Sequence, residues 1–264
     1  MHGLYGKLGI MRIEDYHIPN PPPRGDELPC SDGEPLETER HFRQMTLLIE
    51  SLSDAWRDRY DYFVHGDMFV YYSEPQAREA QIKGTTRYRG PDLFVVLGTE
   101  RRERKSWVAW EEGGKLPDII IEIISPTTEH IDRGVKMDLY ARIWRTPEYY
   151  LYDPAKQQIE GYALNHLAHA YEPMMPLENG DLPVRQLGLR LGLRDLSQDH
   201  LPGPFLRWIH QDGTVLPTGR ERADQERLRA EQERQRAEQE RQRAERAEQR
   251  LRELEAELKK RTRD

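Results

Sequence analysis

Apolar positions with a helical spacing first appear at residues 41–56. The stripe consists of Met45, Leu48, Ile49 and Leu52. It would suit packing on a sheet, and Thr38, just before it, is the expected N-cap. The pattern therefore predicts one amphipathic helix in this segment.

Three apolar runs after this helix are typical of strands. The runs DYFVHGDMFVYY (61–72) and PDLFVVLG (91–98) are expected to be joined through a polar segment around Gly84. The run PDIIIEIIS (117–125) is almost continuously β-branched, which indicates a strand that is covered on both faces. We therefore expect residues 117–125 to form a central strand of a sheet.

A helix and a further strand follow this central strand directly. Val135, Leu139 and Ile143 recur at four-residue spacing, which predicts a helix over residues 132–144, and EYYLYDP (148–154) is typical of another buried strand. This strand, helix, strand order predicts an α/β fold, of the α+β kind with a mixed sheet. Weaker extended segments are expected to form an antiparallel edge: QIEGYAL, HAYEPM and LGLRLGL.

Composition divides the chain into four parts. Residues 1–38 are rich in Pro, Gly and acidic side chains, and successive prolines remove backbone donors, so we expect a disordered arm. Residues 39–200 are expected to form the α/β domain, and the Pro/Gly-rich residues 201–219 a linker. Residues 220–264 consist mainly of Glu, Arg, Gln and Ala, which predicts a charged helix or coiled coil.

This tail repeats in heptads, and AEQERQR occurs twice in succession at residues 230–243. One heptad position holds Ala or Leu from Ala223 to Leu258, but the position three residues later holds Glu until Ala247 and Leu254. Two interpretations fit this pattern: a homodimer through the tail, and a solvated single helix held by Glu–Arg pairs.

Charge limits the classes of function that the chain can perform. The formal net charge is −7, and the tail from residue 220 holds 15 Lys+Arg and 13 Asp+Glu, so the preceding residues carry −9. An acidic body does not hold nucleic acid by its overall charge, so an enzyme would need a bound cation or a local basic cluster. One cluster consists of Arg87, Arg89, Arg101, Arg102, Arg104 and Lys105. A solvated loop is the alternative interpretation of that run.

Cysteine content and hydropathy exclude further classes. Cys30 is the single cysteine, which excludes an intramolecular disulfide and a thiolate zinc site. No stretch approaches the roughly 18 apolar residues of a membrane span, and the first residues lack the apolar core of a signal peptide. We therefore expect a cytoplasmic protein with no membrane partner.

Glu122 is the sharpest anomaly, because it interrupts the apolar run IIIEII. A carboxylate held in such a strand costs several kcal/mol unless a cation, a network of donors or solvent compensates its charge. A wet strand edge is the alternative. Asp92 supplies a second acid at the start of another buried strand, although a Pro-Asp pair is also common in turns.

Two carboxylates from neighbouring strands, together with the backbone carbonyl of Ile123, would offer the hard oxygen ligands that Mg²⁺ or Mn²⁺ prefers. Lys136 lies early in the following helix and can reach back over the end of the strand. There its ammonium would orient a metal-bound water or neutralise the charge of a phosphate. A lysine that only borders the apolar stripe is the alternative.

The span PDIIIEIISPTTEHIDRGVKMDLYARIWRTPEYYLYDP (117–154), with PDLFVV upstream, resembles the Uma-type family of bacterial endonucleases, a branch of the PD-(D/E)XK nuclease superfamily. The resemblance covers residues 41–195 and implies a restriction-endonuclease-like core with flanking helices. It assigns Asp92 as the first acid of the motif and Glu122 as the second. The lysine of the superfamily normally follows the second acid by two residues, where this chain has Ile124; the resemblance assigns that role to Lys136 instead.

The function that this resemblance implies is metal-dependent hydrolysis of nucleic-acid phosphodiesters, with DNA as the expected substrate. Asp92, Glu122 and Lys136 would be catalytic, and Asp92, Glu122 and the carbonyl of Ile123 would bind Mg²⁺ or Mn²⁺. The alternative is a catalytically inactive module with the nuclease fold, which acts as a binding or adaptor protein and assembles through its helical tail.

Four further polar residues lie near these positions in the sequence. Ser125, Thr128 and Asp132 are expected to shape the turn between strand and helix through capping bonds. His41 is expected at the surface, with a place beside the metal or its water as the alternative.

Overall fold

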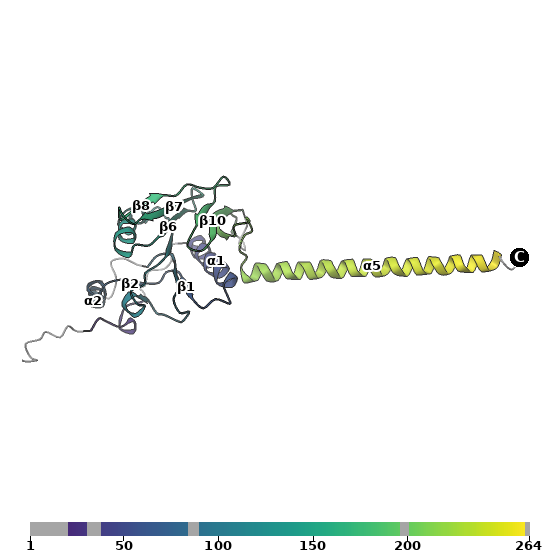
Figure 1. Cartoon of the computed structure of the whole chain (residues 1–264), viewed down its shortest axis with the longest axis horizontal. Helices are drawn as coiled ribbons and strands as arrows, with labels where there is room; N and C mark the ends of the chain where they lie inside the picture. Colours follow the sequence, from purple (N-terminus) through teal and green to yellow (C-terminus); the bar gives the residue numbers. More distant parts are fainter. Residues whose placement is uncertain (1–20, 31–37, 84–89, 196–200, 262–264) are drawn as a thin grey trace, which may run out of the picture.

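The computed structural model describes residues 21–30, 38–83, 90–195 and 201–261. These residues form an α/β domain from which one long helix projects (Figure 1). The main sheet has six strands in the order β1-β3-β5-β6-β7-β8. Their bounds are β1 (Tyr62–His65), β3 (Leu93–Leu97), β5 (Ile119–Ile123), β6 (Glu148–Asp153), β7 (Gln158–Asn165) and β8 (Ala170–Pro173).

The sheet is mixed, as the sequence predicts. β5 and β6 run parallel, and the other neighbouring strands pair antiparallel. Every side chain of β5 is at most 1% exposed. Ile119 and Ile121 join the core on one face of the sheet and Ile120 joins the core on the other. The prediction of a central strand covered on both faces is therefore confirmed.

One face of the main sheet is covered by α1 (Glu39–Ala55) and by a second sheet. Thr38 caps α1 as predicted, because its hydroxyl accepts the backbone N–H of His41 at 3.1 Å. The second sheet has three antiparallel strands in the order β11-β10-β9. These strands are β9 (Leu182–Val184), β10 (Leu189–Arg194) and β11 (Phe205–Ile209).

The prediction of a linker over residues 201–219 is wrong for its middle part, because β11 lies there and is fully buried. Trp208 donates its indole N–H to the carbonyl of Leu48 at 2.9 Å, and Gln44 bonds both backbone groups of Leu206. These partners lie about 160 residues away in the sequence, so the local Pro and Gly content could not reveal them. β10 was expected in the antiparallel edge formed by β7 and β8, but it belongs to this second sheet.

The opposite face of the main sheet is covered by a helix over residues 129–144. It consists of α3 (Glu129–Ile131), the π-helical η4 (Asp132–Lys136), α4 (Met137–Leu139) and the π-helical η5 (Tyr140–Trp144). The helix itself is confirmed, but the apolar spacing that predicts it does not mark the buried face. Val135 and Ile143 are 49% and 56% exposed, whereas Tyr140 and Trp144 are buried.

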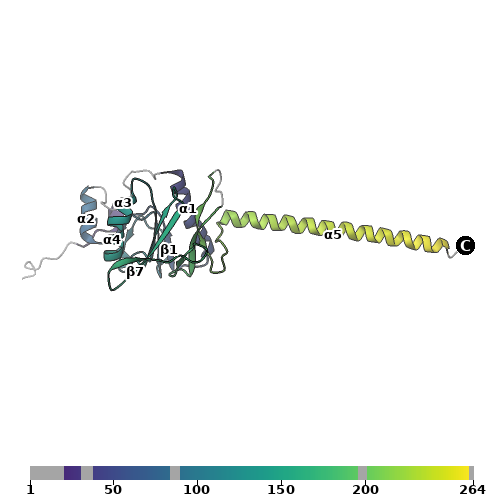
Figure 2. The ribbon, with the colours of Figure 1, turned by 90° about the horizontal axis from the view of Figure 1, so that it is seen from above.

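Shorter elements complete the domain. They are η2 (Gly25–Glu27), α2 (Glu74–Lys83), η3 (Ala109–Glu111) and the parallel pair β2 (Val70–Tyr71) and β4 (Trp107–Val108). Figure 2 shows α2, α3 and α4 at the end of the domain away from the long helix. The weakly amphipathic α2 was not predicted; the expected joining segment at Gly84 lies outside the described residues.

Part of the expected N-terminal arm packs on the domain. Leu28 is buried against Tyr71, whose hydroxyl donates to the carbonyl of Pro29 at 2.5 Å. The expectation of disorder is therefore wrong for residues 21–30, because this short segment fills an apolar hollow beside β2. Residues 1–20 and 31–37 lie outside the described part of the chain.

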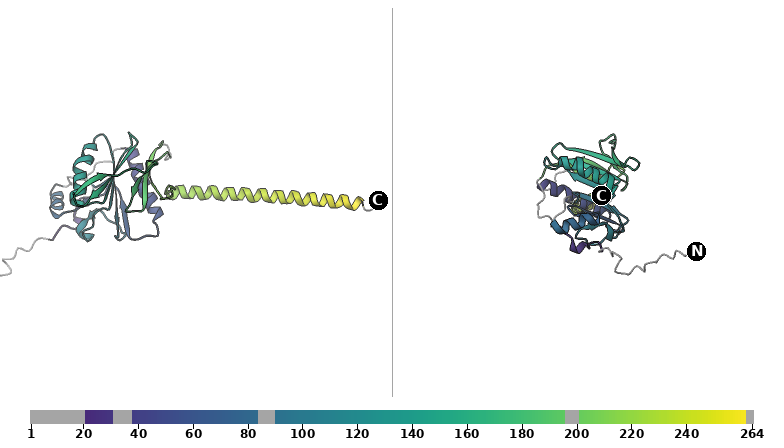
Figure 3. Two further views of the ribbon diagram at one scale, coloured as in Figure 1. Left: turned by 45° about the horizontal axis from the view of Figure 1, so that its top comes forward. Right: turned by 90° about the vertical axis from the view of Figure 1, so that its left-hand side faces the viewer.

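The long helix, α5 (Gly219–Arg261), extends away from the domain in the left-hand view of Figure 3, and the right-hand view looks along it. The prediction of a charged helix from residue 220 is confirmed, because the helix begins at Gly219. Across the described ranges, no helix combines the length and the apolar character needed to cross a membrane.

Candidate active site

Asp92 and Glu122 come together because β3 and β5 are neighbours. The register pairs Leu93 with Ile121, so the residue before β3 meets the end of β5. The backbone N–H of Asp92 donates to Oε2 of Glu122 at 3.2 Å, and the N–H of Ile123 donates to Oδ2 of Asp92 at 2.7 Å. The two acids that the sequence singles out therefore share one end of the sheet.

Glu122 is 0% exposed, and three donors surround it. Tyr140 donates its hydroxyl to Oε1 at 2.8 Å, Lys136 Nζ lies 3.0 Å from Oε2, and Oε2 also accepts the N–H of Asp92. Burial raises the pKa of Glu122 to about 8, because Lys136 does not fully compensate it and Asp92 and Asp132 add negative charge. The alternative of a wet strand edge is therefore wrong.

Lys136 reaches Glu122 from the helix that follows β5. Its ammonium lies 3.0 Å from Glu122 and 2.8 Å from Oδ1 of Asp132, and its side chain is 14% exposed. Burial would lower the pKa of Lys136, but the charges of Glu122, Asp92 and Asp132 outweigh it and raise that pKa above its ordinary value. The lysine is therefore charged, and its ammonium contacts both Glu122 and Asp132.

The sequence predicts that Asp132 shapes the turn, but in the structure Asp132 also pairs with Lys136. It is 1% exposed and lies one helical turn before Lys136, with which it forms the ion pair. Ser125 and Thr128 do shape the turn: the hydroxyl of Ser125 accepts the N–H of Thr128 at 3.2 Å and contacts its hydroxyl at 3.0 Å.

His41 lies beside Asp92 rather than at the surface. It is 7% exposed, and its Nε2 is 3.2 Å from Oδ1 of Asp92. Burial would raise the pKa of Asp92, but His41 and the charge of Lys136 outweigh it, so this pKa lies below its ordinary value. The expectation of a surface histidine is wrong because the first turn of α1 docks over the start of β3.

The sequence predicts no contact for Tyr140, although its hydroxyl holds Glu122 from within the core. Burial, followed by the charge of Glu122, raises the pKa of Tyr140 well above its ordinary value, so the hydroxyl remains a donor. A signal was present in the sequence: Asp132, Lys136 and Tyr140 follow a four-residue spacing, in the row next to the apolar stripe of the same helix.

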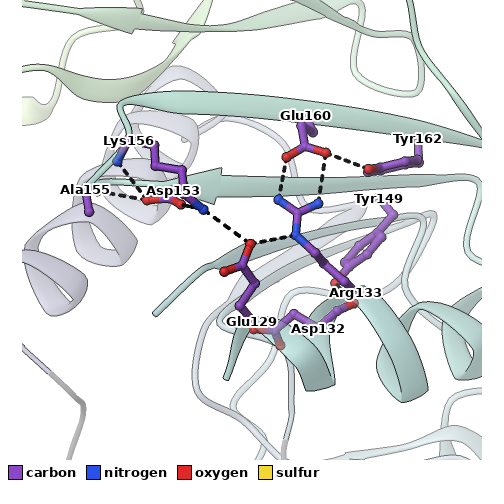
Figure 4. A network of polar contacts seen from close by, with 9 residues as sticks. All are labelled: Glu129, Asp132, Arg133, Tyr149, Asp153, Ala155, Lys156, Glu160 and Tyr162. Atoms are coloured by element: carbon purple, nitrogen blue, oxygen red, sulfur yellow. Dashed lines mark hydrogen bonds and ion pairs between the residues drawn. The ribbon is translucent and has the colours of Figure 1, made fainter. Parts of the chain in front are cut away.

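A second polar network fixes this helix to the sheet (Figure 4). Arg133 forms a bidentate pair with Glu160 on β7, at 2.9 and 2.5 Å, and bonds Glu129 at 2.9 Å. Tyr149 on β6 donates its hydroxyl to the carbonyl of Asp132 at 2.9 Å. These bonds hold the π-helical segment η4, which carries Asp132 and Lys136, over the end of β5.

Two arginines of the basic cluster expected over residues 87–105 form ion pairs within the domain. Arg104 has a side chain that is 2% exposed, and it bonds Glu112 at 2.7 Å, as does Arg102 at 2.5 Å. Arg87 and Arg89 lie outside the described residues. Within the described part, two of the predicted cations therefore stabilise a loop.

The donor set fits a divalent cation in kind and in charge. Three carboxyl groups, Asp92, Glu122 and Asp132, face one ammonium, so the site has an excess of negative charge once Glu122 is ionised, and carboxylate oxygens suit Mg²⁺ and Mn²⁺. Among the described residues, no three His, Cys, Asp or Glu side chains are arranged to hold a metal as they stand. Lys136 already contacts two of the acids, so a cation bound to Glu122 would compete with its ammonium.

Residues 13–199 of the chain match the family described as "Uma2: Putative restriction endonuclease". The chain belongs to this family. The Uma2 match includes Asp92, Glu122 and Lys136 together with most of the described domain, and it ends before α5. The resemblance drawn from the motif at residues 117–154 is thereby confirmed.

Two proteins are similar to this Uma2 chain to different extents. An uncharacterised protein of Synechocystis sp. (strain ATCC 27184 / PCC 6803 / Kazusa) is 31% identical over 85 residues, which are 32% of this chain and 42% of that protein. The chain therefore matches less than half the length of this curated relative. A crystal structure from Anabaena variabilis ATCC 29413, titled as a "putative nuclease belonging to DUF820", has a TM-score of 0.40 and 15% identity, covering 59% of this chain and 80% of its own.

Proposed function

We propose that this chain is a Mg²⁺- or Mn²⁺-dependent endonuclease that hydrolyses phosphodiester bonds in DNA. One observation carries the proposal: in a member of the Uma2 family, Asp92, Glu122 and Lys136 meet at one end of the sheet. Oε2 of Glu122 lies 3.2 Å from the backbone nitrogen of Asp92 and 3.0 Å from Nζ of Lys136. Asp92 and Glu122 would hold the cation, with the carbonyl of Ile123 as a third oxygen ligand. When bound, such a cation polarises a phosphate and lowers the pKa of a coordinated water.

The residues around the acids have separable duties. Lys136 keeps its charge, because its pKa is raised, and it is partly exposed, so its ammonium can neutralise the charge that develops on a phosphate. Asp132 orients that ammonium through the ion pair at 2.8 Å. Tyr140 fixes the Glu122 carboxyl group from the buried side.

Exposure indicates the side from which substrate would approach. The side chains of Asp92 and Lys136 are 22% and 14% exposed, whereas Glu122 is sealed at 0%. A phosphate would therefore meet Asp92 and Lys136 first, and Glu122 would act from beneath them. The acidic body offers little general attraction for a polyanion, which gives a bound cation a role in substrate binding as well.

Cleavage assays test this proposal with a matched control. Supercoiled plasmid and duplex oligonucleotides of DNA and of RNA are incubated with the protein and Mg²⁺ or Mn²⁺, beside Glu122→Gln and the control Glu50→Gln, which makes the same change at an exposed position of α1. We expect cutting that EDTA abolishes, that Glu122→Gln lowers by about 100-fold or more, and that Glu50→Gln retains. Equal cutting by the protein and by Glu122→Gln would overturn the proposal, and cutting of RNA alone would overturn the choice of DNA.

A second function, a nuclease fold that binds without cutting, is favoured by one specific observation. Every carboxylate oxygen of Asp92 and Glu122 already contacts a hydrogen-bonding group of the chain, and Lys136 supplies a cation of the protein's own. If this function holds, duplex DNA is retained by the protein in a mobility-shift assay, and neither metal ion produces cutting above the level of Glu122→Gln.

A further inference from the structure

The helix α5 leaves its apolar residues uncovered between Ala223 and Ala256. All side chains from Ala223 to Ala256 are exposed, and Leu251 and Leu254 are 61% and 44% exposed. A helix of 43 residues extends for about 64 Å. This part of the helix packs against no core of the described domain. Its surface therefore contacts either solvent or a partner.

The base of this helix is fixed to the domain. Arg207 on β11 is 0% exposed and forms a bidentate pair with Glu221 at 2.9 and 2.6 Å. Thr218 caps the helix by accepting the N–H of Glu221 at 3.2 Å, and Arg222 pairs with Asp54 on α1. These contacts set the direction of α5, so anything that binds its far end is held at a defined place relative to the domain.

The far half of α5 carries an apolar seam that the near half lacks. With Ala223 and Leu251 in heptad position a, position d holds Glu through Glu240 and then Ala247 and Leu254. Leu258 continues the seam in the sequence. Glutamates facing one another at d positions repel, so the near half disfavours pairing, whereas the seam beyond Ala244 supports it.

The charges beside the seam select a partner and an orientation. In a parallel, in-register pair, a g residue faces the e residue five positions later in the other helix. In the far half this places Arg243 against Glu248 and Arg250 against Glu255, which attract. In the near half it places arginine against arginine: Arg229 faces Arg234, and Arg236 faces Arg241.

An antiparallel pair is disfavoured by the same charges. Residues at e positions then face one another, which places Glu248 against Glu255. The complementary pattern therefore fits one occupant, an identical helix in parallel register, and it fits only beyond Ala244.

We infer that α5 pairs with α5 of a second copy of this chain, in parallel and in register, from Ala244 toward the end of the helix. The near half, from Gly219 to Arg243, remains two separate charged helices that diverge from the paired segment. Each spans 25 residues, about 38 Å. Two domains are thus carried on one paired stalk, and this inference does not depend on the proposed nuclease activity.

Charge-reversal variants of the full chain test the pairing by sedimentation equilibrium. Arg243→Glu with Arg250→Glu leaves like charges along the seam, as does Glu248→Arg with Glu255→Arg. We expect each variant alone to lose self-association and an equimolar mixture of the two to restore it. The control, Arg246→Glu with Arg252→Glu, makes the same change in charge away from the seam and should associate like the unaltered protein.

Cross-linking tests the register independently of the charges. In a Cys30→Ser background, Leu254→Cys places a thiol at position d, where a parallel in-register pair brings the two copies together. Mild oxidation should give a disulfide-linked dimer, and Arg252→Cys, which faces away from the seam, should not. A monomeric unaltered protein, a mixture that fails to associate, or equal cross-linking at both positions would overturn the inference. Helical content measured by circular dichroism confirms that each variant keeps α5.

Discussion

Replacing Glu122 with glutamine should make the protein more stable at alkaline pH, although it removes the proposed metal ligand. The carboxyl group has an ordinary pKa of 4.5, and burial raises its pKa in the folded protein to about 8. Between these values the unfolded chain has released the proton and the folded protein retains it. Its contribution to stability is therefore fully present below pH 4.5 and is lost as the pH rises toward 8.

The size of this effect follows from the same two values. Each pH unit between them favours the unfolded chain by about 1.4 kcal/mol, so the interval from 4.5 to about 8 corresponds to about 5 kcal/mol. Glutamine is neutral throughout and can still accept the hydroxyl of Tyr140. The free energy of unfolding of Glu122→Gln should therefore fall less with pH than that of the unaltered protein.

Urea unfolding at a series of pH values from 5.5 to about 8.5, in buffer with EDTA, measures this difference. Glu50→Gln is the control, because it makes the same substitution at an exposed position of α1, away from the buried acids. Parallel pH profiles for Glu122→Gln and the unaltered protein would refute the reasoning. Saturating Mg²⁺ should flatten the profile of the unaltered protein, since a bound cation favours the ionised carboxylate.

Three further substitutions test the surroundings of the acids. Lys136→Ala leaves Asp132 and Glu122 without their cation and should cost about 3 kcal/mol in unfolding free energy while lowering cleavage at least about 100-fold; unchanged stability would contradict the ion pairs. Tyr140→Phe removes the buried donor to Glu122 and should lower the free energy of unfolding, measured with urea, by about 1–3 kcal/mol. Unchanged stability would contradict a role for this hydroxyl. Gly66→Ala places a Cβ atom against the carbonyl oxygen of Asp92 and should lower both the melting temperature and cleavage, whereas Gly134→Ala, with open space around it, should lower neither by steric overlap.

The sequence predicts the centre of the fold well because its signals there are local. The run IIIEII marks a strand buried on both faces, and the acid inside that run requires compensation wherever the strand lies. The reach of Lys136 follows from the helix that begins immediately after the strand. Strand and helix are adjacent in sequence, so their geometry depends little on distant residues.

The features that escaped prediction depend on contacts between distant segments. β11 resembles a connector until Leu48 and Gln44 are known to lie against it. His41 resembles a surface residue until α1 docks over Asp92. The helix over residues 129–144 buries the row of Asp132, Lys136 and Tyr140, whose partners lie on distant strands. Of the apolar residues at four-residue spacing, Leu139 packs against the core, whereas Val135 and Ile143 are exposed.

A crystal soaked with Mn²⁺ provides the most direct test of the central claim, since anomalous scattering locates the ion without relying on turnover. We expect a peak bound by Asp92 and Glu122, with the ammonium of Lys136 moved away from Glu122. Ordered crystals that show no peak there at saturating Mn²⁺, with Lys136 still paired to Glu122 and Asp132, would contradict it.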